Sequence, residues 1–256
     1  MQPDKSVVKA ANTEAVSGAE AIDFMALKPN PIDISLIGGT LAANGQQSAN
    51  QQKPSWEPMS KSLFVTRLYK GRIAVPRDLE GTCLGIAAED KAGQRWSREH
   101  GYGGYTSYAS LNDLTRRASL FADLERSIAK QVAAFARELQ FELGGRKLTL
   151  DSLWINVMDK GSGHTPHIHP HSVISGTYYV TVPPKSGVIR FEDPRLPMMM
   201  AAPPRKPKAR PENRAFVDVA PKPGMLLLWE SWLRHGVETN GARGKRISVS
   251  FNYRLD

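Results

Sequence analysis

The sequence changes pattern near residue 148, and this change constrains the fold more than any other feature. Between residues 119 and 143, apolar residues recur at three- and four-residue steps, which predicts an amphipathic helix with one buried stripe. A helix followed by many short strands implies an α+β protein, in which the helix backs an antiparallel β-sandwich or jelly roll. The strands are predicted from short apolar segments that Pro and Gly turn signals separate, at 148–158, 173–182, 187–191, 216–219, 225–229 and 246–253.

The first part of the chain divides at about residue 60. Residues 1–60 are poor in aromatic residues and rich in Ala, Asn, Gln, Ser and Gly, so they bury too little apolar surface to offset their ordering entropy. We expect a flexible tail there, followed by one domain over residues 61–256 with helical support (61–147) and a β core (148–256). The support is predicted to contain a strand, a helix and a loop, at residues 63–65, 77–90 and 101–108.

Composition excludes several classes of protein. No run approaches the roughly 20 apolar residues of a membrane span, so we expect no membrane partner. The N-terminus lacks the basic start and unbroken apolar stretch of a secretory signal. Cys83 is the only cysteine, which excludes an intramolecular disulfide framework and a paired-cysteine metal site and favours the cytoplasm.

The net charge of +9 permits binding to nucleic acid but does not require it, because the basic residues are spread along the chain without interleaved aromatics. Their one dense cluster lies in the proline-rich loop 203–214, where like charges so closely spaced favour water. It comprises Arg205, Lys206, Lys208, Arg210 and Arg214. We therefore interpret it as a solvated loop and do not expect nucleic acid as a partner.

Four of the six histidines lie within eight residues: His164, His167, His169 and His171. In an extended segment, side chains two residues apart share a face, so the last three of these would point the same way. Imidazoles that converge from a rigid strand are what a divalent transition metal needs. The cluster therefore indicates a metal site, although a run of this kind also occurs in solvated loops.

A second group of polar residues lies near the C-terminus. His235 follows an apolar strand, and Arg246 opens the final strand eleven residues later. In a jelly roll His235 would lie close to the upstream histidines. A guanidinium fork matches a carboxylate and keeps its charge at any working pH, so Arg246 is suited to a ligand carboxylate. Taken alone, it would more often form a surface salt bridge.

Several stretches together resemble a known family, the 2-oxoglutarate/Fe(II)-dependent oxygenases of a small bacterial and phage group related to the prolyl-hydroxylase-like oxygenases. The resemblance covers about residues 62–256 and implies a double-stranded β-helix, or jelly roll, with Fe(II) as the metal and 2-oxoglutarate as the cosubstrate. The stretches that carry it are His167-x-His169-Pro170 with the Ser-Gly-x-Tyr-Tyr after it, Phe191-Glu192-Asp193-Pro194-Arg195, Trp229-x-Ser231-Trp232-x-x-His235 and Arg246-Ile247-Ser248-Val249-Ser250-Phe251-Asn252.

The resemblance also implies roles for single residues. His235 would bind the metal, and Arg246 would pair with the far carboxylate of 2-oxoglutarate, assisted by Ser248. Tyr179 would help to hold the cosubstrate, with plain packing as the alternative. The implied reaction is hydroxylation of an unidentified small-molecule or peptide substrate by O2, with release of succinate and CO2.

One position departs from the pattern of the superfamily. Most relatives carry His-x-Asp or His-x-Glu, which gives a two-His, one-carboxylate triad, whereas this chain carries His167-x-His169. We expect a three-His site made of these two residues and His235. A site that holds Zn or Ni without turnover is an alternative. For the third ligand two further alternatives stay open: a carboxylate from Glu192 or Asp193, or a shift of register to His169 and His171.

Two more residues are candidates for substrate binding. Asn156 is a polar residue within an apolar strand, so it needs a partner, either a ligand in the pocket or a structural hydrogen bond. Arg195 ends a Glu-Asp-Pro-Arg turn and would hold an anionic substrate or form a structural salt bridge. The competing function is a metal-binding, cupin-like jelly roll that does not use 2-oxoglutarate, in which Arg246 would be buried against a protein acid.

Overall fold

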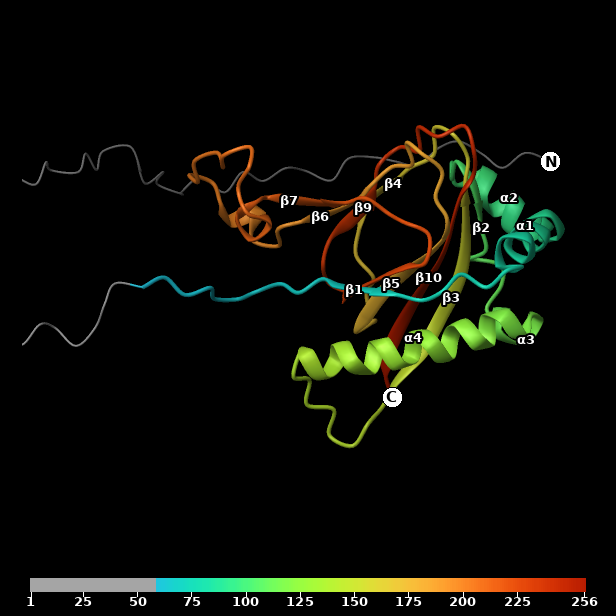
Figure 1. Cartoon of the computed structure of the whole chain (residues 1–256), viewed down its shortest axis with the longest axis horizontal. Coiled ribbons are helices and arrows are strands. Elements are labelled where there is room, and N and C mark those ends of the chain that lie inside the picture. The colour runs from blue at the N-terminus through green and yellow to red at the C-terminus, as the bar shows by residue number, and fades with distance from the viewer. Residues whose placement is uncertain (1–58) are drawn as a thin grey trace, which may run out of the picture. The chain divides into compact units, whose positions relative to one another are not determined.

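The computed structural model describes residues 59–256. The tail predicted for residues 1–60 therefore lies, apart from its last two residues, outside the described part. Within residues 59–256 the protein is α+β, as the sequence predicts, with four α-helices and antiparallel sheets (Figure 1). None of these helices combines the length and the apolar run that a membrane span requires.

Two antiparallel sheets make up the β part of the described residues (Figure 1). The larger has six strands in the order β1-β8-β5-β10-β3-β2, and the smaller has four in the order β4-β9-β6-β7. Most neighbours within a sheet are far apart in the sequence, so residues from distant segments meet. The strands are β1 (Tyr69–Arg72), β2 (Gly104–Thr106), β3 (Leu148–Met158), β4 (His164–His167), β5 (Ile174–Thr181), β6 (Ile189–Glu192), β7 (Phe216–Val219), β8 (Met225–Glu230), β9 (His235–Val237) and β10 (Arg246–Leu255).

The central strands of the six-stranded sheet separate two environments, because successive side chains of a strand point to opposite faces. In β10, Ile247 joins the core beneath the helices, whereas Arg246 and Ser248 line a pocket on the other face. In β5, Tyr178 belongs to the core beneath the helices and Tyr179 to a second cluster on the pocket side. One face of the sheet thus carries the helices and the other carries the polar side chains.

The helices pack on one face of the six-stranded sheet. α1 (Leu79–Glu89), α2 (Lys91–Glu99) and α3 (Leu114–Arg117) precede the long α4 (Ser119–Glu138), which runs across the strands in Figure 1. The apolar stripe of α4 belongs to the same cluster as residues of β3, β5 and β10, so the stripe is core packing. It consists of Phe121, Leu124, Ile128, Val132 and Phe135.

α4 ends before residue 143, the end predicted from the sequence. Gln140 adopts a positive φ of 56°, and its N–H donates to the carbonyl of Arg137 at 3.1 Å. The N–H of Phe141 reaches back to the carbonyl of Ala136 at 3.2 Å. This pair of bonds closes the helix as a Schellman motif, in which glycine is the usual residue at the positive-φ position. Because glutamine is uncommon at such a position, the end of the helix at this residue could not be predicted from the sequence.

The other predictions before α4 are partly corrected. Residues 63–65 form no strand, since their side chains are exposed and Phe64 has a φ of 56°; the first strand is β1, which pairs with β8. Residues 101–108, predicted as a loop, contain β2, which pairs with β3. The predicted helix is α1, but α2 directly follows it, and the Asp90 carboxylate caps α2 by accepting from the Gly93 N–H at 2.9 Å.

A long connection between β6 and β7 carries the basic, proline-rich segment. The two strands pair antiparallel, and residues 193–215 between them contain two short 3₁₀ turns, η2 (Leu196–Met198) and η3 (Pro211–Asn213). The five basic side chains of loop 203–214 are exposed, and so are Met198 and Met200. The basic segment is thus solvated, as the clustering of like charges predicts.

The lone cysteine offers a test of the helical layer. Cys83 lies on the buried side of α1, fully shielded from solvent, and burial raises the pKa of its thiol to about 12. We therefore expect no alkylation by iodoacetamide in the folded protein at mildly alkaline pH and complete alkylation in guanidinium chloride, as measured by mass spectrometry. Rapid labelling of the folded protein would contradict the packing of α1 on the sheet.

Candidate metal centre

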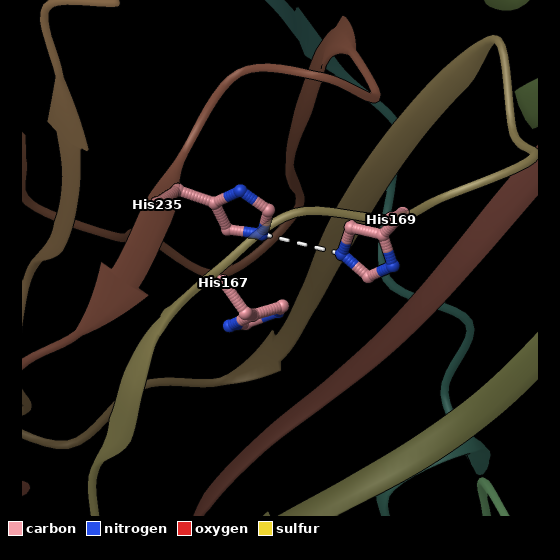
Figure 2. A group of neighbouring side chains, drawn as sticks. All are labelled: His167, His169 and His235. Carbon is pink, nitrogen blue, oxygen red and sulfur yellow. Dashed lines mark hydrogen bonds between the residues drawn. The ribbon is translucent and has the colours of Figure 1, made fainter. Parts of the chain in front are cut away.

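Three imidazoles meet between the two sheets. His167 ends β4, His169 follows two residues later, and His235 opens β9. β4 and β9 pair antiparallel with His167 directly opposite His235, which explains how residues so distant in the sequence come together. One ring nitrogen from each histidine lies within 4.8 Å of the other two, and Figure 2 shows the three rings turned toward one another.

Backbone carbonyls orient two of these rings. Nδ1 of His235 lies 2.9 Å from the carbonyl oxygen of Leu233, and Nδ1 of His167 lies 2.8 Å from that of Thr165. Each bond assigns the proton to Nδ1 and leaves a lone pair on Nε2, as in histidines that bind metals. Nε2 of His169 lies 3.3 Å from Nε2 of His235 (Figure 2), close enough for one cation to bind both.

Burial keeps these imidazoles neutral. It lowers the pKa of His169 to about 4 and that of His235 to about 3, and it also holds the pKa of His167 below its usual value. These pKa values include a smaller lowering by the neighbouring imidazoles. At neutral pH the three rings therefore carry free lone pairs, which is the form that binds a divalent transition metal.

The residues of the alternative ligand sets lie elsewhere. His171 is exposed, with a φ of 68°, and is not part of the group. The Glu192 carboxylate is 3.2 Å from Arg234, and the Asp193 carboxylate binds Arg195 at 2.8 Å. Among residues 59–256 no carboxylate joins the three imidazoles.

A buried arginine without an acid partner faces the same pocket. Arg246 is 2% exposed; its Nη1 donates to the sulfur of Met158 at 2.9 Å, and its Nε has no hydrogen-bond partner in the described residues. Its guanidinium lies 5.1 Å from the ring of Tyr179, whose hydroxyl is also unpartnered there. Because an unpaired buried cation is costly, this arrangement fits an anionic ligand between the guanidinium and the metal site.

One pocket joins the imidazoles and the guanidinium. Tyr179, Ser248 and Asn156, all singled out in the sequence, line it as well. The pocket contains no Asp or Glu among its lining residues, so it offers hydrogen-bond donors and positive charge but no negative charge. Its further lining residues, which sequence analysis did not assign, include Tyr102, Trp154, Met158, His164, Thr177, Trp229 and Ser250. Period-two alternation along β10 could have identified Ser250, whereas Tyr102 comes from a separate segment and carries no signal.

Of the two substrate-binding candidates, Asn156 lines the pocket and Arg195 does not. Asn156 lines the pocket and is also fixed structurally: its Oδ1 accepts from Thr106 at 3.0 Å and from Tyr102 at 3.1 Å, and its Nδ2 donates to Ser250 at 3.1 Å. Arg195 is exposed, binds Asp193 and does not line the pocket. The structural hydrogen bonds expected of Asn156 are thus present, its role in substrate binding stays a prediction, and Arg195 forms the structural salt bridge.

Neutral imidazoles beside a buried guanidinium that lacks an acid are typical of a mononuclear metal enzyme with an anionic cosubstrate. Comparison with known proteins agrees with this class. Residues 152–252 match the model of a family described as "Putative 2OG-Fe(II) oxygenase". The matched residues therefore form an oxygenase domain of the kind that uses Fe(II) and 2-oxoglutarate. No curated protein matches the sequence.

Many solved structures match this chain, including one from Pseudomonas putida and one from Burkholderia pseudomallei. A prolyl-4-hydroxylase of Pseudomonas putida is 16% identical, with a TM-score of 0.50, and the alignment covers 74% of this chain and 93% of that chain. An oxidoreductase of the 2OG-Fe(II) oxygenase family from Burkholderia pseudomallei is 19% identical, with a TM-score of 0.33, and the alignment covers 43% of this chain and 46% of that chain. The similarity to the prolyl-4-hydroxylase shows a shared fold.

Proposed function

We propose that the protein hydroxylates a small-molecule or peptide substrate with O2, binding Fe(II) through His167, His169 and His235. Arg246, Ser248 and Tyr179 hold 2-oxoglutarate. The observation that carries the proposal is the buried guanidinium of Arg246, which has no acid partner in the described residues and lines the same pocket as the three imidazoles. A metal-binding protein without a 2-oxo acid would need an acid at this place.

The chain's residues position and shield the reactants. The three imidazoles hold Fe(II), which, when bound, supplies the oxidative chemistry that converts O2 and 2-oxoglutarate to succinate and CO2 as the substrate is hydroxylated. Arg246 offers two parallel N–H groups to the far carboxylate of 2-oxoglutarate, and the Tyr179 hydroxyl and Ser248 lie on the same sheet face to complete its hydrogen bonds. Burial of the site strengthens these interactions because little water competes.

We further propose that residues 61–256 form one double-stranded β-helix domain, with helical support (61–147) and a β core (148–256). The strand orders β8-β5-β10-β3 and β4-β9-β6-β7 support this fold, since consecutive strands from β3 onward alternate between two facing sheets except where β6 leads directly to β7. We keep Asn156 as a substrate-binding candidate because it lines the pocket. The cytoplasmic location expected from the single cysteine stays a prediction.

The proposed function is tested by calorimetric titration of the Mn(II)- or Ni(II)-loaded protein with N-oxalylglycine, an unreactive analogue of 2-oxoglutarate. We expect one molecule to bind per chain and no binding to the metal-free protein, because the metal and Arg246 hold opposite ends of the analogue. Metal binding without any affinity for N-oxalylglycine would favour the cupin-like alternative. Formation of succinate from 2-oxoglutarate by the Fe(II)-loaded protein in air checks turnover.

A further inference from the structure

A fourth histidine, His164, is directed into the pocket by an irregularity in β4. In this strand His164 pairs with Val237 and His167 with His235, so four residues of β4 lie opposite three residues of β9. Side chains three residues apart on a regular strand face opposite ways, but the extra residue of this bulge lets both rings line the pocket. The two ring centroids are 4.7 Å apart.

The neighbouring sequence is adapted to the bulge. Pro166, which has no N–H to donate to the ladder, lies within it. On the facing strand, Gly236 lies so close that a Cβ there would be 2.9 Å from the carbonyl oxygen of His164 and 3.2 Å from the nitrogen of Pro166. A side chain at position 236 would therefore push the bulge away, and glycine allows the two backbones to approach.

His164 lines the same pocket as the three-imidazole group and Arg246. Its ring packs edge-on against Tyr102, with centroids 5.2 Å apart, and no side-chain hydrogen bond engages its ring nitrogens in the described residues. It is not part of the three-imidazole group. An imidazole carries at least one N–H in either protonation state, so the ring offers a donor to the pocket that it lines.

We propose that His164 is a further residue that binds the 2-oxo acid, donating its N–H to a carboxylate oxygen from the four-stranded sheet while Arg246 binds from the six-stranded sheet. The inference rests on the proposed function. A carboxylate offers about four lone-pair sites, more than the guanidinium fork fills, so a donor from the opposite side adds to the binding. His164 would then favour acids with two carboxylates over neutral molecules in this pocket.

The test compares His164→Leu, which removes the donor, with His164→Gln, which restores an N–H donor, and with His171→Leu, a change at an exposed histidine. The Kd values for Mn(II) and then for N-oxalylglycine are measured by calorimetry. We expect His164→Leu to weaken N-oxalylglycine binding about 10-fold or more, since a hydrogen bond to a charged group is lost. His164→Gln should restore most of the affinity, and the Kd for Mn(II) should change little in all three variants.

Two results would overturn the inference. An unchanged Kd for N-oxalylglycine in His164→Leu would show that the ring does not contact the 2-oxo acid. A parallel loss of Mn(II) affinity would make His164 a metal ligand instead. A failure of the proposed function is distinct from both, because the unsubstituted, metal-loaded protein would then not bind N-oxalylglycine at all.

Discussion

Arg246→Met is expected to weaken the binding of N-oxalylglycine to the metal-loaded protein by about 100-fold, while leaving the Kd for Mn(II) nearly unchanged. The reason is that truncation of one partner of a buried charge pair costs about 2–5 kcal/mol. Methionine keeps much of the apolar stem and removes the charge. Isothermal titration calorimetry measures both constants, and Arg243→Met, an exposed arginine in the preceding turn, is the matched control.

The same substitution should increase the stability of the protein when no ligand is bound. Because Arg246 is buried without an acid partner in the described residues, its replacement by an apolar side chain removes a desolvation cost. We expect the free energy of unfolding in urea to be about 1–3 kcal/mol higher for the metal-free Arg246→Met variant than for the unsubstituted protein. A large loss of stability, with binding of N-oxalylglycine intact, would mean that the guanidinium is a structural group.

His235→Ala is expected to weaken Mn(II) binding by more than about 100-fold, because loss of even an outer-shell partner of a metal ligand typically costs 10- to 100-fold. Equilibrium dialysis with metal analysis measures the effect. His171→Ala is the control, since His171 belongs to the same sequence cluster but is exposed and lies outside the three-imidazole group. An unchanged affinity in His235→Ala would contradict the proposed ligand set.

The alternative third ligands are separated by the same measurement. His169→Ala should reduce Mn(II) affinity strongly, whereas Glu192→Gln and Asp193→Asn should leave it within a few-fold, because these two carboxylates are bound to arginines. A strong effect of either carboxylate variant with none from His169→Ala would restore the two-His, one-carboxylate reading.

The local sequence pattern is sufficient to predict most of the long strands. The segments around β3, β5, β8 and β10 are predicted within one or two residues, because each is long, apolar and bounded by turn residues. The apolar stripe of α4 is likewise predicted from its spacing. By contrast, residues 63–65 are apolar but exposed, and they form no strand. Three apolar residues are too short a segment for the sequence alone to show whether they pair with another strand.

The site was predictable only where its residues form a local motif. His167 and His169 stand out because they are two residues apart, and His235 and Arg246 because of the family resemblance. The bulge that directs His164 inward depends on its pairing with β9, which no local pattern encodes. Tyr102 reaches the pocket because the segment ahead of β2 joins the edge of β3, and that long-range pairing is equally hidden in the sequence.

The pairing of β4 with β9 has a consequence for how the protein matures. Two of the three imidazoles are 66 residues apart along the chain, and Arg246 lies further still toward the C-terminus. A growing polypeptide on the ribosome therefore has no complete cluster until β9 has been synthesised. Metal binding by this cluster therefore requires β9, and a chain truncated ahead of β9 should be unable to retain the ion.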